Sequence, residues 1–340
     1  MKVGVIGAGT MGGMHADLLA GLDEVSGLIV VDADADRASA VAQRTGGRAM
    51  SLDAALAEAD AIIVATPPEL HASAVESALD AGLHVLCEKP LTDSLASTIQ
   101  LTQRAEASGV HVEVGFHRRH DAGFASTRRA IADGDTGRIH LLSLTANDPV
   151  VPPMAAPTGP APEAAVNFRD SSIHDFDLTR FLTGQEVLEV SVEGGRRDGS
   201  RPDDPREVER AITTMRLSDG TLAVLESSWL NPSGYDARIE LVAERTVLSA
   251  GLSPRTSVRH MDWPGVAADP WSGYLERFTD AYRAELIAFL AAARGERAPA
   301  TTARDGLEAM RIAVAATRSH VEHRRVSLDE IDGLAQTEVA

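Results

Sequence analysis

The most constraining feature of the sequence is a glycine pattern between an apolar run and a helical segment near the N-terminus. The run KVGVI, residues 2–6, has the β-branched character of a buried parallel strand. GAGTMG follows at once, with Gly7, Gly9 and Gly12 in the G-x-G-x-x-G spacing, and TMGGMHADLLAGL then predicts a helix. A strand, this turn and a helix begin a βαβ unit, so the sequence predicts an α/β fold.

Each glycine in the turn has its own physical reason. Gly7 permits the tight turn, Gly9 lets the backbone approach a pyrophosphate, and Gly12 allows the helix to pack closely on the strand. The N–H groups at the start of the helix, at Thr10 and Met11, are expected to bind the phosphates of a dinucleotide with help from the helix dipole. The alternative is an ordinary glycine-rich turn between a strand and a helix.

A carboxylate follows the second apolar run. GLIVVD ends in Asp32, about 20 residues after Gly12, which is the spacing of the acidic residue that binds the adenosine ribose hydroxyls. Such a carboxylate repels a 2′-phosphate, so NAD is favoured over NADP. Arg37 follows shortly afterwards and would soften that preference. The alternative for Asp32 is an ordinary aspartate in a strand-end turn.

Segments typical of strands and helices continue to alternate up to Phe116, which indicates a parallel sheet. Ligands of such sheets bind at the carboxyl ends of the strands. This rule selects the segment after Phe116 and two further groups of residues: Thr66, Pro67 and Pro68; and Glu88, Lys89 and Pro90. Position alone leaves Lys89 either as a solvated lysine or as an ammonium group beside a reacting oxygen.

Composition narrows the class of partner. The net charge of −18 argues against binding to nucleic acid, and the single cysteine, Cys87, excludes an intrachain disulfide and a cysteine-rich zinc site. Glycines interrupt the N-terminal apolar run where a signal peptide would continue. No apolar run reaches the roughly 18 residues of a membrane span. We therefore expect a cytoplasmic protein that does not associate with membranes.

Four ionisable groups lie close together in NFRDSSIHDFDLTRFLTG, residues 167–184: Asp170, His174, Asp175 and Asp177. In a helix, Asp170 and His174 would share a face, with Asp177 near it. The stretch could be a group of catalytic residues, a metal site, or a helix cap followed by a solvated helix face. One histidine without an H-E-x-x-H pattern is a poor metal site, so no metal is expected. Asp170 could also serve as the N-cap.

Three segments resemble the Gfo/Idh/MocA oxidoreductases, the family of glucose–fructose oxidoreductase and inositol dehydrogenase. They are GAGTMGGMHADLL, ATPPELHASAVESALDAGLHVLCEKPL and VGFHRRHDAGF, of which the TPP-x-x-H run followed by CEKP is the most specific. The resemblance implies a Rossmann domain, residues 1–120, and an α+β domain, residues 121–340, with a large, mostly antiparallel open sheet. The C-terminal helices could pack back on the first domain, and a homodimer or homotetramer is expected.

The same resemblance implies roles for particular residues. His71 and Glu88 would belong to the cofactor site, and Lys89 would lie beside the nicotinamide and the reacting carbon. FRDSSIHDFDLTRFL resembles the matching segment of inositol dehydrogenases, which implies a catalytic group of Lys89, Asp170 and His174. The implied reaction is NAD-dependent oxidation of a secondary hydroxyl of a cyclic polyol, such as myo-inositol or an isomer, to an inosose. Candidate substrate contacts are Arg118, Asp148, Asp177, Trp271 and Tyr282.

Two departures from the family pattern concern the substrate. His117 stands where asparagine is commoner, and MAAPTGPAPEAAVN, residues 154–167, replaces the Tyr-Ile and Ser-Gly-Gly runs of inositol dehydrogenases. The proline-rich run that begins at Pro149 is expected to form the rim or lid of an active site, or else a surface connector. Alternatives to an inositol dehydrogenase are a dehydrogenase of another sugar or anhydrosugar and a non-catalytic NAD-binding protein.

Overall fold

The computed structural model describes residues 1–149, 168–196, 198–201, 204, 208–262 and 265–332. Contacts between residues divide the chain into two compact units. Unit 1 contains Met1–His120 and Asp280–Met310, and unit 2 contains Asp121–Thr279 and the chain from Arg311. The proline-rich run expected at an active-site rim falls largely outside the described residues.

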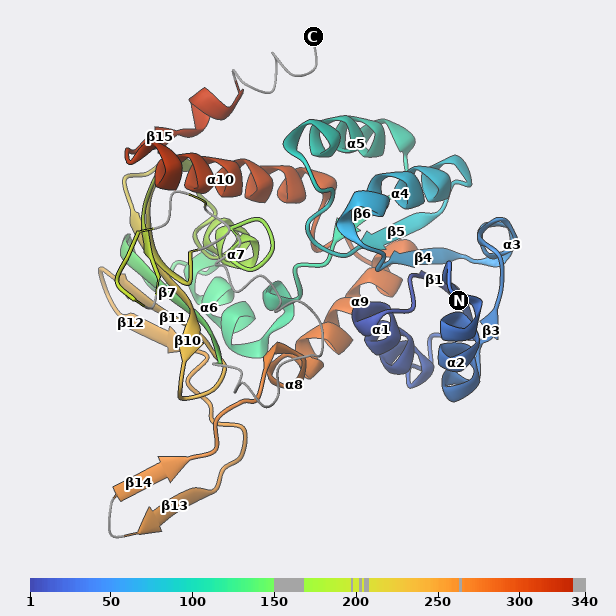
Figure 1. Ribbon diagram of the computed structural model, residues 1–340, viewed down its shortest axis with the longest axis horizontal. Coiled ribbons are helices and arrows are strands. Elements are labelled where there is room, and N and C mark those ends of the chain that lie inside the picture. The colour runs from blue at the N-terminus through green and yellow to red at the C-terminus, as the bar shows by residue number, and fades with distance from the viewer. Residues whose placement is uncertain (150–167, 197, 202–203, 205–207, 263–264, 333–340) are drawn as a thin grey trace. The chain divides into compact units, whose positions relative to one another are not determined.

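Unit 1 contains a six-stranded parallel sheet in the order β3-β2-β1-β4-β5-β6 (Figure 1). This order is that of a doubly wound dinucleotide-binding sheet, whose ligand site lies at the carboxyl ends of the strands where the winding reverses, between β1 and β4. The strands are β1 (Lys2–Ile6), β2 (Gly27–Val31), β3 (Arg48–Ala49), β4 (Ala61–Val64), β5 (His84–Cys87) and β6 (Val112–Val114).

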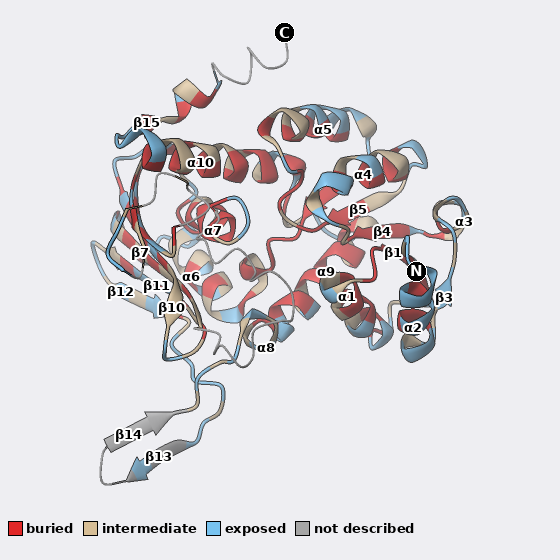
Figure 2. Ribbon diagram, viewed as in Figure 1, coloured by how far each residue is buried: buried red, intermediate tan, exposed pale blue. Residues whose placement is uncertain are grey.

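Helices cover both faces of this sheet (Figure 1). Unit 1 includes α1 (Thr10–Ala20), α2 (Ala35–Thr45), α3 (Leu52–Glu58), η1 (Pro68–Leu70), α4 (His71–Asp80), α5 (Leu95–Ser108), η2 (His117–His120) and α9 (Thr279–Ala293). Apolar residues of α1, α2 and α9 form one core with β1, β2 and β4, and α9 contributes Leu286, Phe289 and Leu290. A helix from late in the sequence thus completes one face of the sheet. Figure 2 shows the central strands β1 and β4 as largely buried.

Unit 2 contains a seven-stranded mixed sheet in the order β12-β11-β7-β10-β9-β8-β15. Only β7 and β10 pair in parallel among these strands, and the other neighbours are antiparallel. The strands are β7 (Ile139–Pro149), β8 (Val187–Gly195), β9 (Arg210–Leu217), β10 (Leu222–Asn231), β11 (Asp236–Ala243), β12 (Val247–Ala250) and β15 (Val326–Ser327). The predicted fold class, a Rossmann domain plus an α+β domain with a large, mostly antiparallel sheet, is confirmed.

The helices of unit 2 are α6 (Ala122–Ala132), α7 (Ile173–Thr183), α8 (Tyr274–Arg277) and the part of α10 (Ala303–Glu322) that follows Met310. A separate hairpin of β13 (Arg259–Asp262) and β14 (Gly265–Ala268) projects away from the seven-stranded sheet (Figure 1). Along β9, buried and exposed residues alternate, so one face of the sheet is packed and the other is open.

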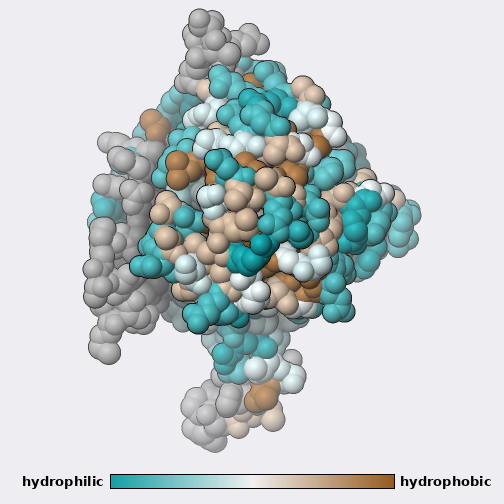
Figure 3. Space-filling model, turned by 90° about the vertical axis from the view of Figure 1, so that its right-hand side faces the viewer, coloured by the Kyte–Doolittle hydropathy of each residue, from teal (hydrophilic) through white to brown (hydrophobic). Residues whose placement is uncertain are grey.

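The face of the molecule in Figure 3 mixes hydrophilic and weakly hydrophobic residues, with strongly hydrophobic ones only singly or in small groups. This face therefore presents no broad apolar patch among its described residues. Within the described part of the chain, no helix is long and apolar enough to span a membrane.

Candidate functional site

The glycine turn of unit 1 has the close contacts that its spacing predicts. Gly7 has a φ of +96°, and a Cβ there would lie 2.5 Å from the carbonyl oxygen of Ala65. A Cβ on Gly12 would lie 1.8 Å from the carbonyl oxygen of Gly7. The fold of the turn itself therefore requires glycine at Gly7 and Gly12, because a Cβ atom at either position fits only if the backbone moves.

Gly9 differs from its two neighbours in the motif. A Cβ at Gly9 would meet no atom within 4 Å, and this residue occupies the N-cap position of α1 without a capping side chain. The fold of the turn therefore does not need a glycine here. A ligand that approaches the helix N-terminus, however, would need the space that a side chain would fill. Nearby, Thr66 Oγ1 is buried and has no hydrogen-bond partner among the described residues. Both features fit a bound dinucleotide.

Asp32 follows β2 and holds the glycine turn. Its Oδ2 accepts a hydrogen bond from the Ala8 N–H at 2.6 Å, and its Oδ1 accepts one from the Asp34 N–H at 2.9 Å. The Arg37 guanidinium lies 3.3 Å from Asp34 and 3.9 Å from Asp32. Arg37 is thus engaged chiefly with Asp34, and the Asp32 carboxylate remains at the strand end where a ribose would lie.

His71 links the two loops that follow β4 and β5. Its ring is 1% exposed, with Nε2 2.8 Å from the Thr66 carbonyl oxygen and Nδ1 2.8 Å from the Pro90 carbonyl oxygen. The ring therefore ties the TPP loop to the loop that carries Lys89. This position gives the histidine of the TPP-x-x-H run a structural role beside the CEKP run.

Lys89 follows β5 at the same edge of the sheet as the glycine turn. Its backbone N–H donates to Oε2 of Glu88 at 3.2 Å, and Oε1 of Glu88 lies 2.7 Å from Nε2 of His15 on α1. Burial raises the pKa of the Glu88 carboxyl, but the hydrogen bond and charge of His15, together with Lys89, outweigh it and hold that pKa below its ordinary value. Glu88 is therefore a buried carboxylate rather than a neutral acid.

Tyr282 of α9 lies beside two histidines of unit 1. Its ring stacks on His117 with centroids 4.1 Å apart, and it meets His15 edge to face at 6.0 Å. Burial, and then the positive charges of Arg118 and Lys89, hold the pKa of His117 well below its ordinary value. His117 is thus a neutral imidazole near Lys89, and its ring contact gives the histidine at this position a packing role. The Arg118 side chain is also buried.

A pH effect on stability follows from His120 at the end of η2. Burial, and then the charges of Arg297 and Arg119, lower the pKa of His120 from 6.5 to about 4. The unfolded chain therefore binds a proton in this window that the folded chain does not. His120 makes its full contribution to the free energy of unfolding above pH 6.5. As the pH falls toward 4, this free energy decreases by at most about 1.4 kcal/mol per pH unit.

We expect His120→Gln to flatten the fall in stability between pH 6.5 and 4. Urea unfolding of the wild type and the variant across this range would measure the slope for each, with His140→Gln, at an exposed histidine of β7, as the control. Parallel curves for wild type and His120→Gln would contradict the neutral state of the partly buried His120.

In unit 2, helix α7 carries part of the ionisable stretch but does not include Asp170. The helix begins at Ile173 with Ser172 at the N-cap, and Asp170 lies exposed in the preceding turn. The prediction that Asp170 is the N-cap is therefore wrong, and Asp170 does not belong to the helix that carries His174. The reason is local: the Asp175 N–H bonds to the Ser172 carbonyl, and the helix starts there.

Most polar residues of α7 are buried. His174 is 9% exposed and Asp177 is 1% exposed, so the reading of this stretch as a solvated helix face is wrong (Figure 2). Carboxylates and imidazoles are rarely buried without a specific purpose. Within the part of the chain that the structure describes, no group of three or more His, Cys, Asp or Glu residues could hold a metal ion.

The remaining predicted substrate contacts lie in different surroundings. Strand alternation puts Asp148, near the end of β7, on the same side of the sheet as the buried Leu142 and Leu144. The Trp271 indole N–H donates to the Ser253 carbonyl oxygen at 2.9 Å, and the Arg277 guanidinium lies over the ring. These Trp271 contacts are packing contacts within unit 2.

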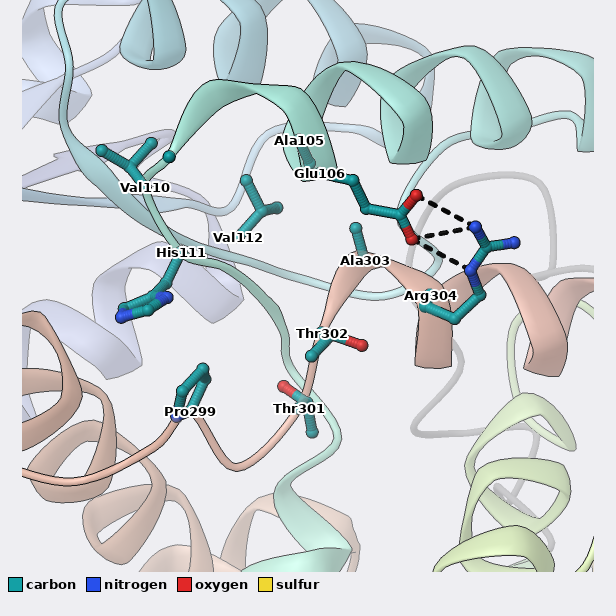
Figure 4. Close-up of a pocket in the computed structure, with 11 residues that line it drawn as sticks. Ala105, Glu106, Val110, His111, Val112, Pro299, Thr301, Thr302, Ala303 and Arg304 are labelled. Atoms are coloured by element: carbon teal, nitrogen blue, oxygen red, sulfur yellow. Dashed lines mark hydrogen bonds and ion pairs between the residues drawn. The ribbon is translucent and has the colours of Figure 1, made fainter.

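A cavity of about 440 Å³ in unit 1 lies away from the residues described above. It is at the amino end of β6, whereas the glycine turn and Lys89 are at the carboxyl edge of the sheet. Its charged groups, Glu106 and Arg304, pair with each other at 2.9 Å, and hydroxyl and apolar groups form much of the remaining wall (Figure 4). This cavity therefore takes no part in the site at the carboxyl edge.

Sequence reasoning missed His15, which the fold brings against Glu88. The residue lies three positions after Gly12, so helical periodicity places it on a face near that of the glycine. A polar residue on the inward face of the dinucleotide helix was the available signal. Its partner could not be predicted because the contact joins residues far apart in the chain.

Comparison with known proteins now adds to this geometry. Residues 1–116 match the model of the oxidoreductase family with an NAD-binding Rossmann fold, and residues 124–249 match the GFO/IDH/MocA C-terminal domain. The chain belongs to the Gfo/Idh/MocA family of oxidoreductases, which confirms the predicted resemblance.

Relatives over the full length point to a subgroup of this family. The chain is 37% identical to the myo-inositol dehydrogenase Hyg17 of Streptomyces leeuwenhoekii, over 94% of this chain and 97% of that protein. It is 31% identical to the myo-inositol 2-dehydrogenase of Thermotoga maritima, over 98% and 100% of the two chains. The crystal structure of scyllo-inositol dehydrogenase from Lactobacillus casei, with NAD(H) and scyllo-inositol, matches with a TM-score of 0.87 and 26% identity over 97% and 99%.

Proposed function

We propose that this chain is an NAD-dependent dehydrogenase that oxidises a secondary hydroxyl of an inositol to the corresponding inosose. The observation that carries the proposal is the position of Lys89, at the same sheet edge as the dinucleotide turn, in a chain similar over its full length to inositol dehydrogenases. An initial-rate panel of inositol isomers and monosaccharides tests it. Faster oxidation of a monosaccharide or anhydrosugar than of every inositol would instead favour a sugar dehydrogenase.

The residues at the sheet edge fit NAD. Gly9 leaves open space at the start of α1 for the pyrophosphate, and Asp32 ends β2 where the adenosine ribose would lie. The first-turn N–H groups of α1, from Thr10 and Met11, would face the phosphates. When bound, NAD supplies the hydride acceptor of the reaction at C4 of its nicotinamide ring.

Three side chains would carry the proton and charge chemistry. His174 takes the proton of the reacting hydroxyl, which a histidine can do near neutral pH. Asp170, in the turn before α7, would orient the imidazole and stabilise its protonated form, which is the role that the resemblance to inositol dehydrogenases implies. Lys89 donates a hydrogen bond to the same oxygen and stabilises the negative charge that develops there. The substrate carbon loses a hydride and its oxygen loses a proton, so a ketone results.

A preference for NAD over NADP belongs to the same proposal. Asp32→Ala is expected to weaken NAD binding by about tenfold and to narrow the preference over NADP, because the carboxylate both holds the Ala8 N–H and repels a 2′-phosphate. Fluorescence titration with both nucleotides measures the two affinities. Asp36→Ala, which removes an exposed charge from the first turn of α2, is the control. Unchanged affinities for NAD and NADP in Asp32→Ala would contradict the assignment of Asp32 to the ribose site.

We also propose a homodimer or homotetramer built through the open face of the unit 2 sheet. The proposal is supported by Ile212 of β9 and Leu222 of β10, which are 44% and 45% exposed on that face. Burial of such side chains against a second copy would be favourable. Light scattering of the purified chain tests this, and a monomer mass would contradict it.

A further inference from the structure

The buried pair of His15 and Glu88 has no place in the chemistry proposed above. His15 is on α1, the helix that begins at the glycine turn, and Glu88 immediately precedes Lys89. Their side chains are 1% and 7% exposed, and Nε2 of His15 lies 2.7 Å from Oε1 of Glu88. A buried carboxylate loses its hydration, so it needs such a partner to remain charged.

Each oxygen of the Glu88 carboxylate has a different partner. Oε1 faces His15, and Oε2 accepts the backbone N–H of Lys89 at 3.2 Å. One carboxylate therefore connects the dinucleotide helix to the backbone of the lysine. Because this hydrogen bond is made by the backbone of Lys89, it affects the position from which the lysine side chain extends.

The Glu88 carboxylate lies close to Gly115. Gly115 follows β6, and a Cβ there would lie 3.2 Å from Oε2 and 3.3 Å from Cδ of Glu88. The absence of a side chain at Gly115 therefore leaves room for the carboxylate in the position where it meets His15.

The imidazole of His15 is also held from outside the pair. Tyr282 meets it edge to face, and the same tyrosine stacks on His117. Among the described residues, Nδ1 of His15 has no hydrogen-bond partner, so Glu88 provides the one hydrogen bond of the ring. Replacing His15 removes this hydrogen bond together with the Tyr282 ring contact, so the test needs a second variant that keeps the hydrogen bond alone.

We infer that His15 and Glu88 form a positioning pair that fixes the backbone of Lys89 relative to the dinucleotide helix α1. Neither residue is a catalytic residue in this account, since both act through Lys89. The inference rests on the proposed function for its kinetic consequence, but the structural link between α1 and Lys89 does not depend on which substrate is oxidised.

Two polar variants of His15 separate positioning from general packing. The amide nitrogen of glutamine can reach the place of Nε2, so His15→Gln retains a donor to Glu88. The shorter side chain of asparagine places its amide near the position of the His15 Nδ1, so His15→Asn retains no donor to Glu88. His140→Asn, at an exposed histidine of β7, is the matched control.

The first measurement is backbone amide exchange of the peptide around Lys89, in the NAD complex without any polyol. We expect exchange to be at least about ten times faster in His15→Asn than in wild type, and within about threefold of wild type in His15→Gln and His140→Asn. Equal exchange in all four proteins, or equally fast exchange in both His15 variants, would overturn the inference.

The second measurement is turnover with the polyol that the wild type oxidises. We expect His15→Asn to lower kcat by about 10- to 100-fold with the KM for NAD within about threefold, and His15→Gln to restore most of kcat. A loss confined to the KM for NAD would overturn the inference. If the wild type oxidises no polyol, the proposed function fails, while the exchange comparison still decides whether the pair positions Lys89.

Discussion

His174→Ala is expected to lower kcat by about two to four orders of magnitude while NAD binding stays within about threefold of wild type. The imidazole is the group proposed to take the hydroxyl proton, and α7 holds it in a largely buried position. Without it, the proton must pass to water or to a poorly placed carboxylate. Steady-state kinetics with the best polyol substrate measure the loss, and nucleotide fluorescence measures NAD affinity.

His140→Ala provides the control for this experiment, because it removes an exposed histidine from β7 of the same unit. Its kcat should equal that of the wild type. Circular dichroism of both variants checks that α7 and the sheet remain folded. Full activity in His174→Ala would remove this histidine from the mechanism.

The second large effect is expected at the glycine turn. Gly12→Ala should lower NAD affinity by about 100-fold or more, because its Cβ would lie 1.8 Å from the Gly7 carbonyl oxygen and the turn must move. Gly9→Ala should also weaken NAD binding, although the free protein has room for that methyl group. Thermal unfolding without nucleotide should therefore show a lower Tm for Gly12→Ala and an almost unchanged Tm for Gly9→Ala.

Gly21→Ala is the matched control, since this glycine ends α1 and a Cβ there makes only ordinary contacts. It should leave both NAD affinity and Tm close to the wild-type values. Wild-type NAD affinity in Gly9→Ala would show that the pyrophosphate does not pass over this residue. An unchanged Tm in Gly12→Ala would contradict the packing of the turn.

The Rossmann domain could be predicted from the sequence because its signals are local. A strand, a glycine turn and a helix follow one another, and a carboxylate ends the next strand at Asp32. Parallel strands place their carboxyl ends at one edge, so the sequence predicts Lys89 at the same edge of the sheet as the turn. The family resemblance then supplied the second sheet, whose strand order no local pattern determines.

Long-range contacts account for what could not be predicted. The ring contacts of Tyr282 and the pairing of His15 with Glu88 both join residues from distant parts of the chain. The error at Asp170 had another origin. The i, i+4 spacing assumed a helix that starts earlier, whereas α7 begins at Ile173 and most of its polar side chains are buried.

The most direct test of the central claim follows deuterium from a polyol to the nicotinamide. The inositol isomer with the highest initial rate would be prepared with deuterium on its ring carbons and incubated with the wild-type protein and NAD. Mass spectrometry of the reduced nucleotide measures the transfer. We predict one deuterium in each reduced nicotinamide and an equal amount of inosose. Reduced nucleotide without deuterium, or none from any inositol while NAD binds, would contradict it.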